Sequence, residues 1–354
     1  MKIIFTEQPD FEQWIRINKF TYEKNIKDYF ASKNILEYDS LLIEKISGSL
    51  KQAYEYFQTA KNTSLHISPL LVYYGYTNLL YGIMCLKTGK NVIIKDHGMK
   101  IQINDDMVQV GEVSIRPVNN DTGGLAVYSK YYSNNIKLCD SGEWGLNEVL
   151  GMIPELHHYF MELYNKNPFV LPIERVNSDS GYLERIIISD ERIKKLLDYF
   201  YEFNHVKKTY LRPQVNDNYV ILRKKIHSED ITVSSLSGER FLQLPIIKNG
   251  AEYIPNKIVS YLMALFTLSY LSRYRPETWF PFVNNDNSGE KLIFEKFISL
   301  SIRVLPNIVL NELENEEYIF TNKMNSVIET EKKLTRREIE NMINEIIGKK
   351  KKVW

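Results

Sequence analysis

Residues 68–86 read SPLLVYYGYTNLLYGIMCL, a nearly continuous apolar run. Ser68 is a favourable N-cap residue, and Pro69 suits the first helical turn, where its missing N–H breaks no hydrogen bond. The run predicts a helix that is apolar nearly all round, which is typical of a helix buried on every side. It is at the lower length limit for crossing a bilayer. It also contains small and polar residues, which are Gly75, Thr77, Asn78 and Gly82. A buried central helix is therefore favoured over a membrane span.

Further helices are predicted around this one. Apolar residues recur at helical spacing between about residues 10 and 61, and other helices are expected over 144–164, 257–273 and about 290–305. Pro154 marks the first turn of a second helical piece, because a proline inside a helix breaks the hydrogen-bond ladder. The chain is therefore expected to have a mainly helical body.

Two stretches, at about 91–139 and 182–247, instead combine short β-like runs with turn residues. One of these runs is Leu125–Tyr128, directly after an Asn- and Gly-rich turn. We predict an α+β fold in which antiparallel β-strand insertions decorate the helical body. The expected division is a body over 1–315 and a charged C-terminal segment over 316–354.

The composition is that of a soluble globular protein. The chain has 354 residues, of which 44% are hydrophobic and 25% charged, and its formal net charge is +1. A nearly neutral chain lacks the overall field that draws proteins to nucleic acids or anionic membranes. Two cysteines, Cys85 and Cys139, form no disulfide framework, and the N-terminal MKIIFTEQPDFEQW lacks the apolar stretch of a signal peptide. These features predict a cytoplasmic protein.

Two Glu-x-x-His pairs raise the question of a metal site. Glu155 with His158 and Glu202 with His205 have the spacing that helices use in di-iron bundles. Projected at 100° per residue, however, both carboxylates face away from the apolar stripe of their helix. We therefore predict no metal and no cofactor. His157 lies near the apolar stripe and is expected to be a core or interface histidine.

Common catalytic motifs are missing from the sequence. It contains no phosphate-binding Gly-x-x-x-x-Gly-Lys-Ser/Thr loop, no Gly-x-Gly-x-x-Gly turn and no Gly-x-Ser-x-Gly elbow. The Arg-to-His spacing of helical HEPN ribonucleases is also missing. Cys85 lies in the predicted buried helix, where a thiol acts as a small hydrophobe. No catalytic residue is assigned, and a role other than catalysis is favoured.

His97 belongs to one of two polar clusters that could bind a ligand. It lies between Asp96 and Gly98 after a strand-like run, and the ordinary pKa of histidine suits acid–base chemistry. The favoured alternative is structural: Gly98 supplies a positive φ and His97 caps the turn.

The other cluster ends the predicted helix over 257–273. Arg273 and Arg275 could bind the last carbonyls of that helix, which is the favoured reading. Alternatively the two arginines form a fork for phosphate or carboxylate, with Trp279 as a stacking wall. The candidate anion site therefore comprises His97, Arg273, Arg275 and Trp279.

The C-terminal segment has its own pattern. Residues 335–338, TRRE, fit a capping box that begins a helix with one narrow apolar stripe. This stripe either docks on the body or meets a partner, and its candidate partner-binding residues are Ile339, Met342, Ile343 and Ile346. The last basic residues are more typical of a solvated end than of a nucleic-acid contact, and they are Lys349, Lys350, Lys351 and Lys352.

Several short motifs, in order, resemble those of the YaaC-like proteins of bacteria. They are ISPLLVYYG at 67–75 with Asn78-Leu79-Leu80, His97-Gly98, WGLNEVL at 144–150 with IPEL at 153–156, and Leu268-Ser269 with RYRP at 273–276 and Trp279. The resemblance covers about residues 40–300. It implies a mostly helical bacterial cytosolic protein with strand insertions, and it brings no catalytic residues to this chain.

Two hypotheses about function remain open. The favoured one is a binding, sensing or scaffold protein that acts in a bacterial cytosolic assembly, with a protein partner or a homo-oligomer, in stress or anti-phage defence. The alternative is an enzyme or nucleotide-responsive protein that acts on a phosphorylated or nucleic-acid ligand. Under the alternative, His97, Arg273 and Arg275 would carry the site.

Overall fold

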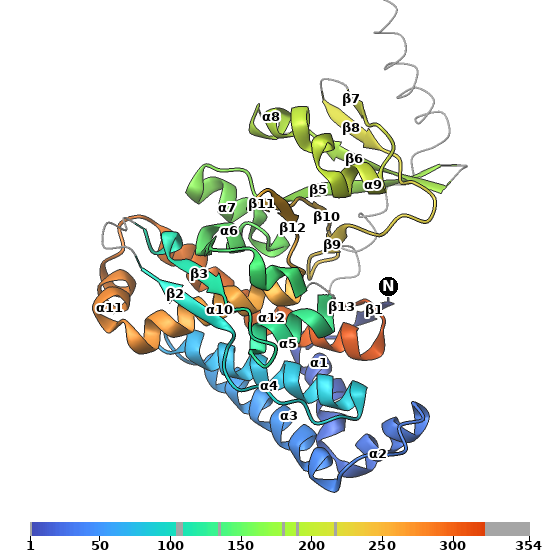
Figure 1. The fold of residues 1–354 in the computed structure, drawn as a ribbon, viewed down its shortest axis with the longest axis vertical. Coiled ribbons are helices and arrows are strands. Elements are labelled where there is room, and N and C mark those ends of the chain that lie inside the picture. Colours follow the sequence, from blue (N-terminus) through green and yellow to red (C-terminus); the bar gives the residue numbers. More distant parts are fainter. Residues whose placement is uncertain are drawn as a thin grey trace, which may run out of the picture. The chain divides into compact units, whose positions relative to one another are not determined.

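A computed structural model describes residues 2–103, 109–133, 136–178, 181–188, 191–215 and 218–322. By its internal contacts the chain divides into two compact units. Unit 1 is formed by residues 2–163 and Pro255–Asn322, and unit 2 by Tyr164–Ile254. Both combine helices with antiparallel strands, so the fold is α+β as predicted. Figure 1 shows the elements of both units.

Unit 1 is mainly helical. Its helices are α1 (Pro9–Asn18), α2 (Glu23–Ser32), α3 (Ser40–Ala60), α4 (Ser68–Thr88), α5 (Gly124–Ser133), α6 (Leu146–Leu150), α7 (His157–Tyr164), α10 (Lys257–Tyr274), α11 (Pro276–Asn285) and α12 (Glu290–Glu314). A three-stranded antiparallel sheet is formed by β2 (Met99–Gln102), β3 (Ser114–Pro117) and β4 (Trp144–Gly145). Near the N-terminus, β1 (Lys2–Phe5) pairs in parallel with β13 (Tyr318–Thr321).

Helix α4 is the centre of unit 1, as its sequence predicts. It packs against α3, α10 and α12, and its buried residues lie on all sides of the helix. Figure 1 shows α3 and α4 running side by side. The helix begins one residue earlier than expected, because Ile67 is the N-cap and Ser68 already belongs to the helix. None of the helices in the described ranges has the length and apolarity needed to cross a membrane.

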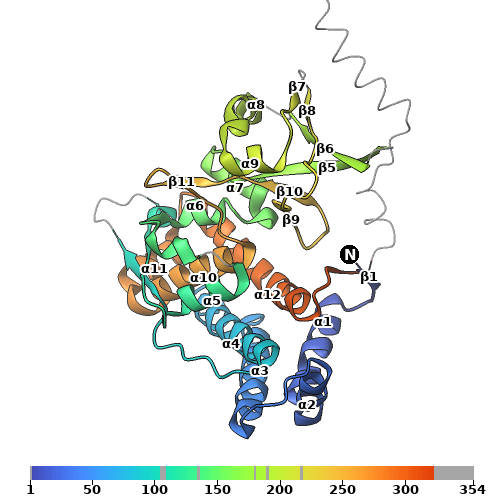
Figure 2. The same ribbon diagram turned by 45° about the vertical axis from the view of Figure 1, so that its right-hand side comes forward.

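Unit 2 is built on a six-stranded antiparallel sheet in the order β7-β8-β6-β5-β10-β9. These strands are β5 (Val170–Ser178), β6 (Gly181–Ile187), β7 (Gln214–Val215), β8 (Tyr219–Leu222), β9 (Thr232–Ser234) and β10 (Arg240–Gln243). A separate hairpin joins β11 (Ile246–Lys248) to β12 (Ala251–Tyr253). Figure 2 shows α8 (Glu191–Tyr199) and α9 (Asn204–Thr209) beside this sheet.

Two of the expected elements are wrong in detail. Residues 125–128 form part of α5 and not a strand, because the hydroxyls of Tyr128 and Tyr132 donate to the α4 carbonyls of Thr77 and Leu80. The predicted helix over 144–164 is divided into β4, α6, a 3-10 turn at Pro154–Leu156 and α7. Pro154 does begin the second helical piece, as expected.

Candidate functional site

Backbone contacts to the start of α5 hold the segment that carries His97. The carbonyls of Asp96 and His97 accept from the first two N–H groups of α5, at 2.8 and 3.0 Å. These bonds satisfy donors that the helix itself cannot pair. Gly98 has a φ of 70°, and a Cβ on Gly123 would lie 2.7 Å from the Gly98 Cα. The close approach of two glycines therefore fixes the position of His97.

The His97 imidazole faces α4 and α10, and it does not cap its own turn. Asp96 performs the capping, since its Oδ1 accepts from the Gly98 N–H at 2.7 Å. Nδ1 of His97 lies 2.7 Å from the Tyr73 hydroxyl, and the imidazole centroid lies 5.2 Å from that of Phe266. Burial raises the pKa of Tyr73 well above its ordinary value, so the hydroxyl stays protonated and donates to a neutral imidazole.

We expect His97 to make the protein less stable as the pH falls. Burial, together with the nearby Arg273 charge, lowers the pKa of His97 in the folded protein. The unfolded chain therefore binds a proton more readily, and the free energy of unfolding falls as the pH drops below about 6.5. Urea titrations between pH 7 and pH 5 should show a smaller loss in His97→Gln than in the parent. Equal slopes for the two proteins would contradict this assignment.

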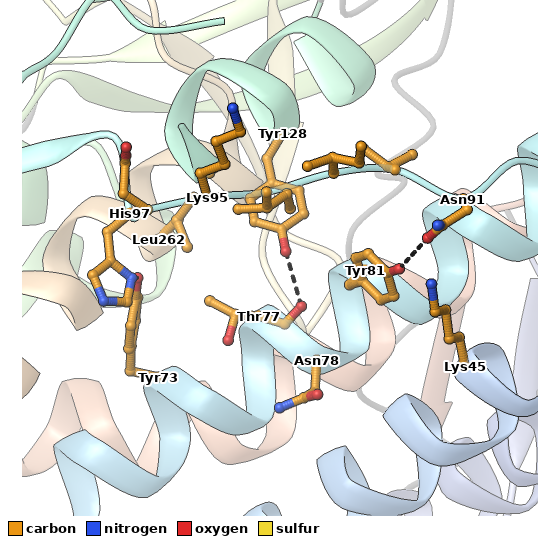
Figure 3. Close-up of a pocket in the computed structure, with 15 residues that line it drawn as sticks. Lys45, Tyr73, Thr77, Asn78, Tyr81, Asn91, Lys95, His97, Tyr128 and Leu262 are labelled. Carbon is orange, nitrogen blue, oxygen red and sulfur yellow. Dashed lines mark hydrogen bonds between the residues drawn. The ribbon is translucent and has the colours of Figure 1, made fainter. Parts of the chain in front are cut away.

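A cleft of about 540 Å³ opens between α4 and residues 91–97. Its size is within the range of small-molecule sites, which is roughly 300–1,000 Å³. Side chains from α3, α4, α5 and α10 complete its lining (Figure 3). His97 and Tyr73 form one end, and Tyr81 lies two helical turns further along α4, about 12 Å away at 1.5 Å per residue. The cleft therefore has two chemically distinct ends.

The end near Tyr81 is polar and positively charged. The Tyr81 hydroxyl donates to Asn91 Oδ1 at 2.9 Å, and Lys45 projects from α3 toward both residues (Figure 3). Lys45 is half-buried, and no carboxylate in the described part of the chain lies within ion-pairing distance of it. Burial raises the pKa of the nearby Cys85 thiol, which therefore stays protonated at neutral pH. Lys45 is thus the main source of positive charge at this end.

Arg273 lies beside the residues of the His97 end without lining the cleft. Its guanidinium donates to the Tyr74 hydroxyl and lies over the ring of Tyr274, 4.1 Å from the centroid. Tyr74 follows Tyr73 on α4, and their ring centroids are 5.5 Å apart. The structure therefore brings His97 and Arg273 into one neighbourhood through two consecutive tyrosines.

The other two residues of the predicted anion set have different surroundings. Arg275 Nε lies 2.7 Å from Glu277 Oε1, and both side chains are exposed. Trp279 is 2% exposed and packs against Phe282 with ring centroids 5.4 Å apart. A tryptophan at this depth is part of the hydrophobic core, so it does not form an open stacking wall.

The helical projection was right for Glu202 and wrong for Glu155. Glu202 is an exposed side chain paired with Lys207. Glu155 is 4% exposed, and it accepts hydrogen bonds from Lys257 and Tyr261. Its orientation was wrong because the predicted helix is interrupted between α6 and α7, so the projected phase does not continue across the break. His157 is buried, as predicted.

The remaining predictions concern metal binding and the two contact regions near the C-terminus. No group of three His, Cys, Asp or Glu side chains within the described ranges is arranged to hold a metal ion. The proposed partner-binding stripe at 339–346 and the lysines at 349–352 lie outside those ranges, so both assignments stay predictions.

The residues that sequence reasoning missed are those of the cleft wall, namely Lys45, Thr77, Asn78, Tyr81, Asn91 and Tyr128. Helical periodicity identified α3 and α4 but gave no reason to single out Lys45 among 45 lysines and arginines. The available signal was the row of polar residues within an otherwise apolar helix, because Tyr73, Thr77 and Tyr81 recur every four residues on one face of α4.

No curated protein and no solved structure matches the chain. The model of the YaaC-like protein family matches residues 12–313, which include all of the residues that line the cleft. This match covers most of the chain, and the chain therefore belongs to the YaaC-like protein family.

Proposed function

We propose that this protein binds a small anionic molecule in the cleft between α4 and residues 91–97. The observation that carries the proposal is Lys45. It is a half-buried cation that projects into a cleft, with no carboxylate partner in the described part of the chain. Partial burial of a charge has a desolvation cost, which an anionic ligand at this position would offset. The negative charge of the ligand is expected to lie beside Lys45, at the end of the cleft near Tyr81.

Hydrogen-bonding groups around Lys45 support the same ligand class. Asn91 accepts from Tyr81 through its side-chain oxygen, so its amide N–H groups can donate to a ligand. Asn78 donates to the Tyr74 carbonyl, which leaves its side-chain oxygen as an acceptor. A cation beside amide donors and acceptors is suited to a phosphate or carboxylate group attached to a polar body.

The far end of the cleft is expected to recognise an uncharged part of the ligand. The His97 imidazole and the Tyr73 hydroxyl are neutral at pH 7, because the pKa of His97 is lowered and that of Tyr73 is raised. Lys95 and Asp96 also line the cleft there, but both are exposed and their opposite charges add no net charge. The ligand would thus carry its charge at one end and reach about 12 Å along α4. Nucleoside monophosphates and sugar phosphates have this length and polarity.

Lys45→Met tests the proposal, with Lys51→Met as its matched control. Lys51 is an exposed lysine on the same helix, outside the cleft. Isothermal titration calorimetry with inorganic phosphate, adenosine monophosphate and citrate should identify an anion that binds the parent and Lys51→Met with equal affinity. Its affinity for Lys45→Met should fall by about 10-fold or more, since a charge-assisted hydrogen bond contributes about 1.5–3 kcal/mol. Equal affinity in Lys45→Met, or equal binding of uncharged adenosine, would contradict the proposal.

A binding or sensing role agrees with the favoured hypothesis from the sequence. The alternative is an enzyme or nucleotide-responsive protein. His97 and Arg273, two of its candidate site residues, are neighbours, whereas Trp279 is buried in the core and is not available as a stacking surface. Action in an assembly and a role in defence stay predictions. Native mass spectrometry of the gently purified full chain tests the first of these, because it reports subunit stoichiometry and any retained ligand mass together.

A further inference from the structure

Unit 2 contains a second cluster of charged groups, on one face of its six-stranded sheet. Arg240 on β10 is opposite Ile173 of β5. Ile173 lies two residues before Arg175, and side chains two apart on a strand point to the same face, so the two arginines share a face. Arg175 is opposite Glu184 of β6, which places that carboxylate on this face as well. Lys224 follows β8, two residues after Leu222, the partner of Glu184. Strands β10 and β5 and the residues after β8 therefore direct three cations to one side of the sheet, and β6, between β5 and β8, adds Glu184.

The three cations surround the carboxylate of Asp230. Its Oδ2 lies 3.3 Å from Arg240 Nη2 and 3.5 Å from Arg175 Nη2, and its Oδ1 lies 3.9 Å from Lys224 Nζ. The backbone N–H and the hydroxyl of Thr232 both donate to Oδ1, at 3.0 and 2.7 Å. Asp230 is thus held two residues before β9, with Oδ2 facing both arginines.

Arg240 has a hydrogen-bond donor that this cluster does not use. Its Nε is buried without a hydrogen-bond partner in the described part of the chain, whereas its Nη2 lies 3.3 Å from Asp230 Oδ2. Glu184 is a second carboxylate on this face, but it is 1% exposed and accepts from the Tyr210 hydroxyl, and its Oε1 lies 3.7 Å from Arg175 Nε. The cluster therefore has donor capacity, on Arg240, that the described residues do not use.

Burial differs between the cations and the acid. The side chains of Arg175, Lys224 and Arg240 are only 22–23% exposed, whereas Asp230 is 44% exposed. Partly desolvated guanidinium groups interact with anions more strongly than surface lysines do, and their planar forks match the oxygens of phosphate. Asp230 occupies the open side of this group. A ligand from solvent would meet the same cations from that side.

We propose that Arg175, Lys224 and Arg240 form a phosphate-binding site, and that Asp230 takes the place of the phosphate when no ligand is bound. The phosphate belongs either to a small phosphomonoester or to a nucleic-acid backbone, since both present the same oxygens. This site is independent of the cleft in unit 1, because all of its residues belong to unit 2.

Asp230→Asn is the decisive variant. An asparagine keeps the side-chain oxygen that accepts from Thr232 and removes the negative charge between the arginines. We expect it to bind inorganic phosphate about 10-fold more tightly than the parent, whereas Arg240→Gln should bind at least 10-fold more weakly. Lys195→Gln, an exposed lysine on α8 outside the cluster, serves as the control and should match the parent.

All four proteins carry Lys45→Met, so that the cleft in unit 1 does not contribute and the two proposals can fail separately. Calorimetric titration of the full chain with inorganic phosphate and adenosine monophosphate reports the phosphomonoester, and fluorescence anisotropy with a labelled oligothymidylate reports the nucleic-acid backbone. Binding in either arm with the expected order of variants supports the site. Unchanged or weaker binding in Asp230→Asn would show that the cluster is only a structural salt-bridge network. Binding that Arg240→Gln does not alter would show an adventitious ion only, and the proposal would be wrong.

Discussion

Lys257→Met should lower the free energy of unfolding of unit 1 by about 3 kcal/mol. Lys257 and Glu155 form an ion pair with side chains 12% and 4% exposed, and Glu155 also accepts from the Tyr261 hydroxyl at 3.3 Å. Removing the lysine takes a counter-charge away from a buried carboxylate, a change that typically costs about 3–5 kcal/mol. The lower end of this range applies because Glu155 remains near the N-terminus of α10, where the helix dipole favours a negative charge.

The double variant Glu155→Leu with Lys257→Met should recover most of this loss, because the buried carboxylate is then removed together with its lysine. Lys27→Met is the surface control, since Lys27 and Glu23 are exposed on α2, and it should leave the unfolding curve unchanged. Urea unfolding followed by tryptophan fluorescence reports mainly on unit 1, because three of the four tryptophans, Trp14, Trp144 and Trp279, belong to it, whereas Trp354 lies outside the described residues. A double variant as unstable as Lys257→Met would contradict the buried-charge explanation.

How well the sequence predicts this fold depends on the length of each pattern. The helices over 68–88 and 257–274 were predicted closely because each is long, apolar and bounded by proline or a capping residue. A run of four residues such as Leu125–Tyr128 fits a strand as well as one turn of a helix. Hydroxyl bonds to α4 decide between them, and those partners are about 50 residues away in the sequence.

The candidate sites were harder to predict than the fold for the same reason. His97 and Arg273 could be singled out as unusual residues, but their link through Tyr73 and Tyr74 depends on the packing of α10 against α4. Lys45 becomes a site residue only because α3 lies along α4 beside Tyr81. In unit 2, Arg175, Lys224 and Arg240 meet through the order of the strands, which local sequence does not contain.

Gly75→Val should separate α3 from α4 and so lower both stability and ligand affinity. A Cβ on Gly75 would lie 2.9 Å from the ring of Phe57 and 3.1 Å from the Cβ of Tyr56, and the latter atom cannot move without the α3 backbone. Overpacking of this kind costs about 1–3 kcal/mol, and valine adds two methyl groups to the clashing Cβ, so a loss of about 3 kcal/mol is expected. Lys45 is carried by α3, so the anion that binds the parent should also bind more weakly.

Gly48→Val provides the matched comparison on α3. Nothing lies within 4 Å of a Cβ at Gly48, and valine has a somewhat better helix propensity than glycine, so this change should alter stability by less than about 1 kcal/mol. Urea unfolding by tryptophan fluorescence, together with titration of the same anion, measures both effects. If Gly75→Val were as stable as Gly48→Val, the close α3–α4 contact would not be the feature that positions Lys45. A stability loss with unchanged affinity would show that the packing of α3 against α4 stabilises the protein but does not determine ligand binding.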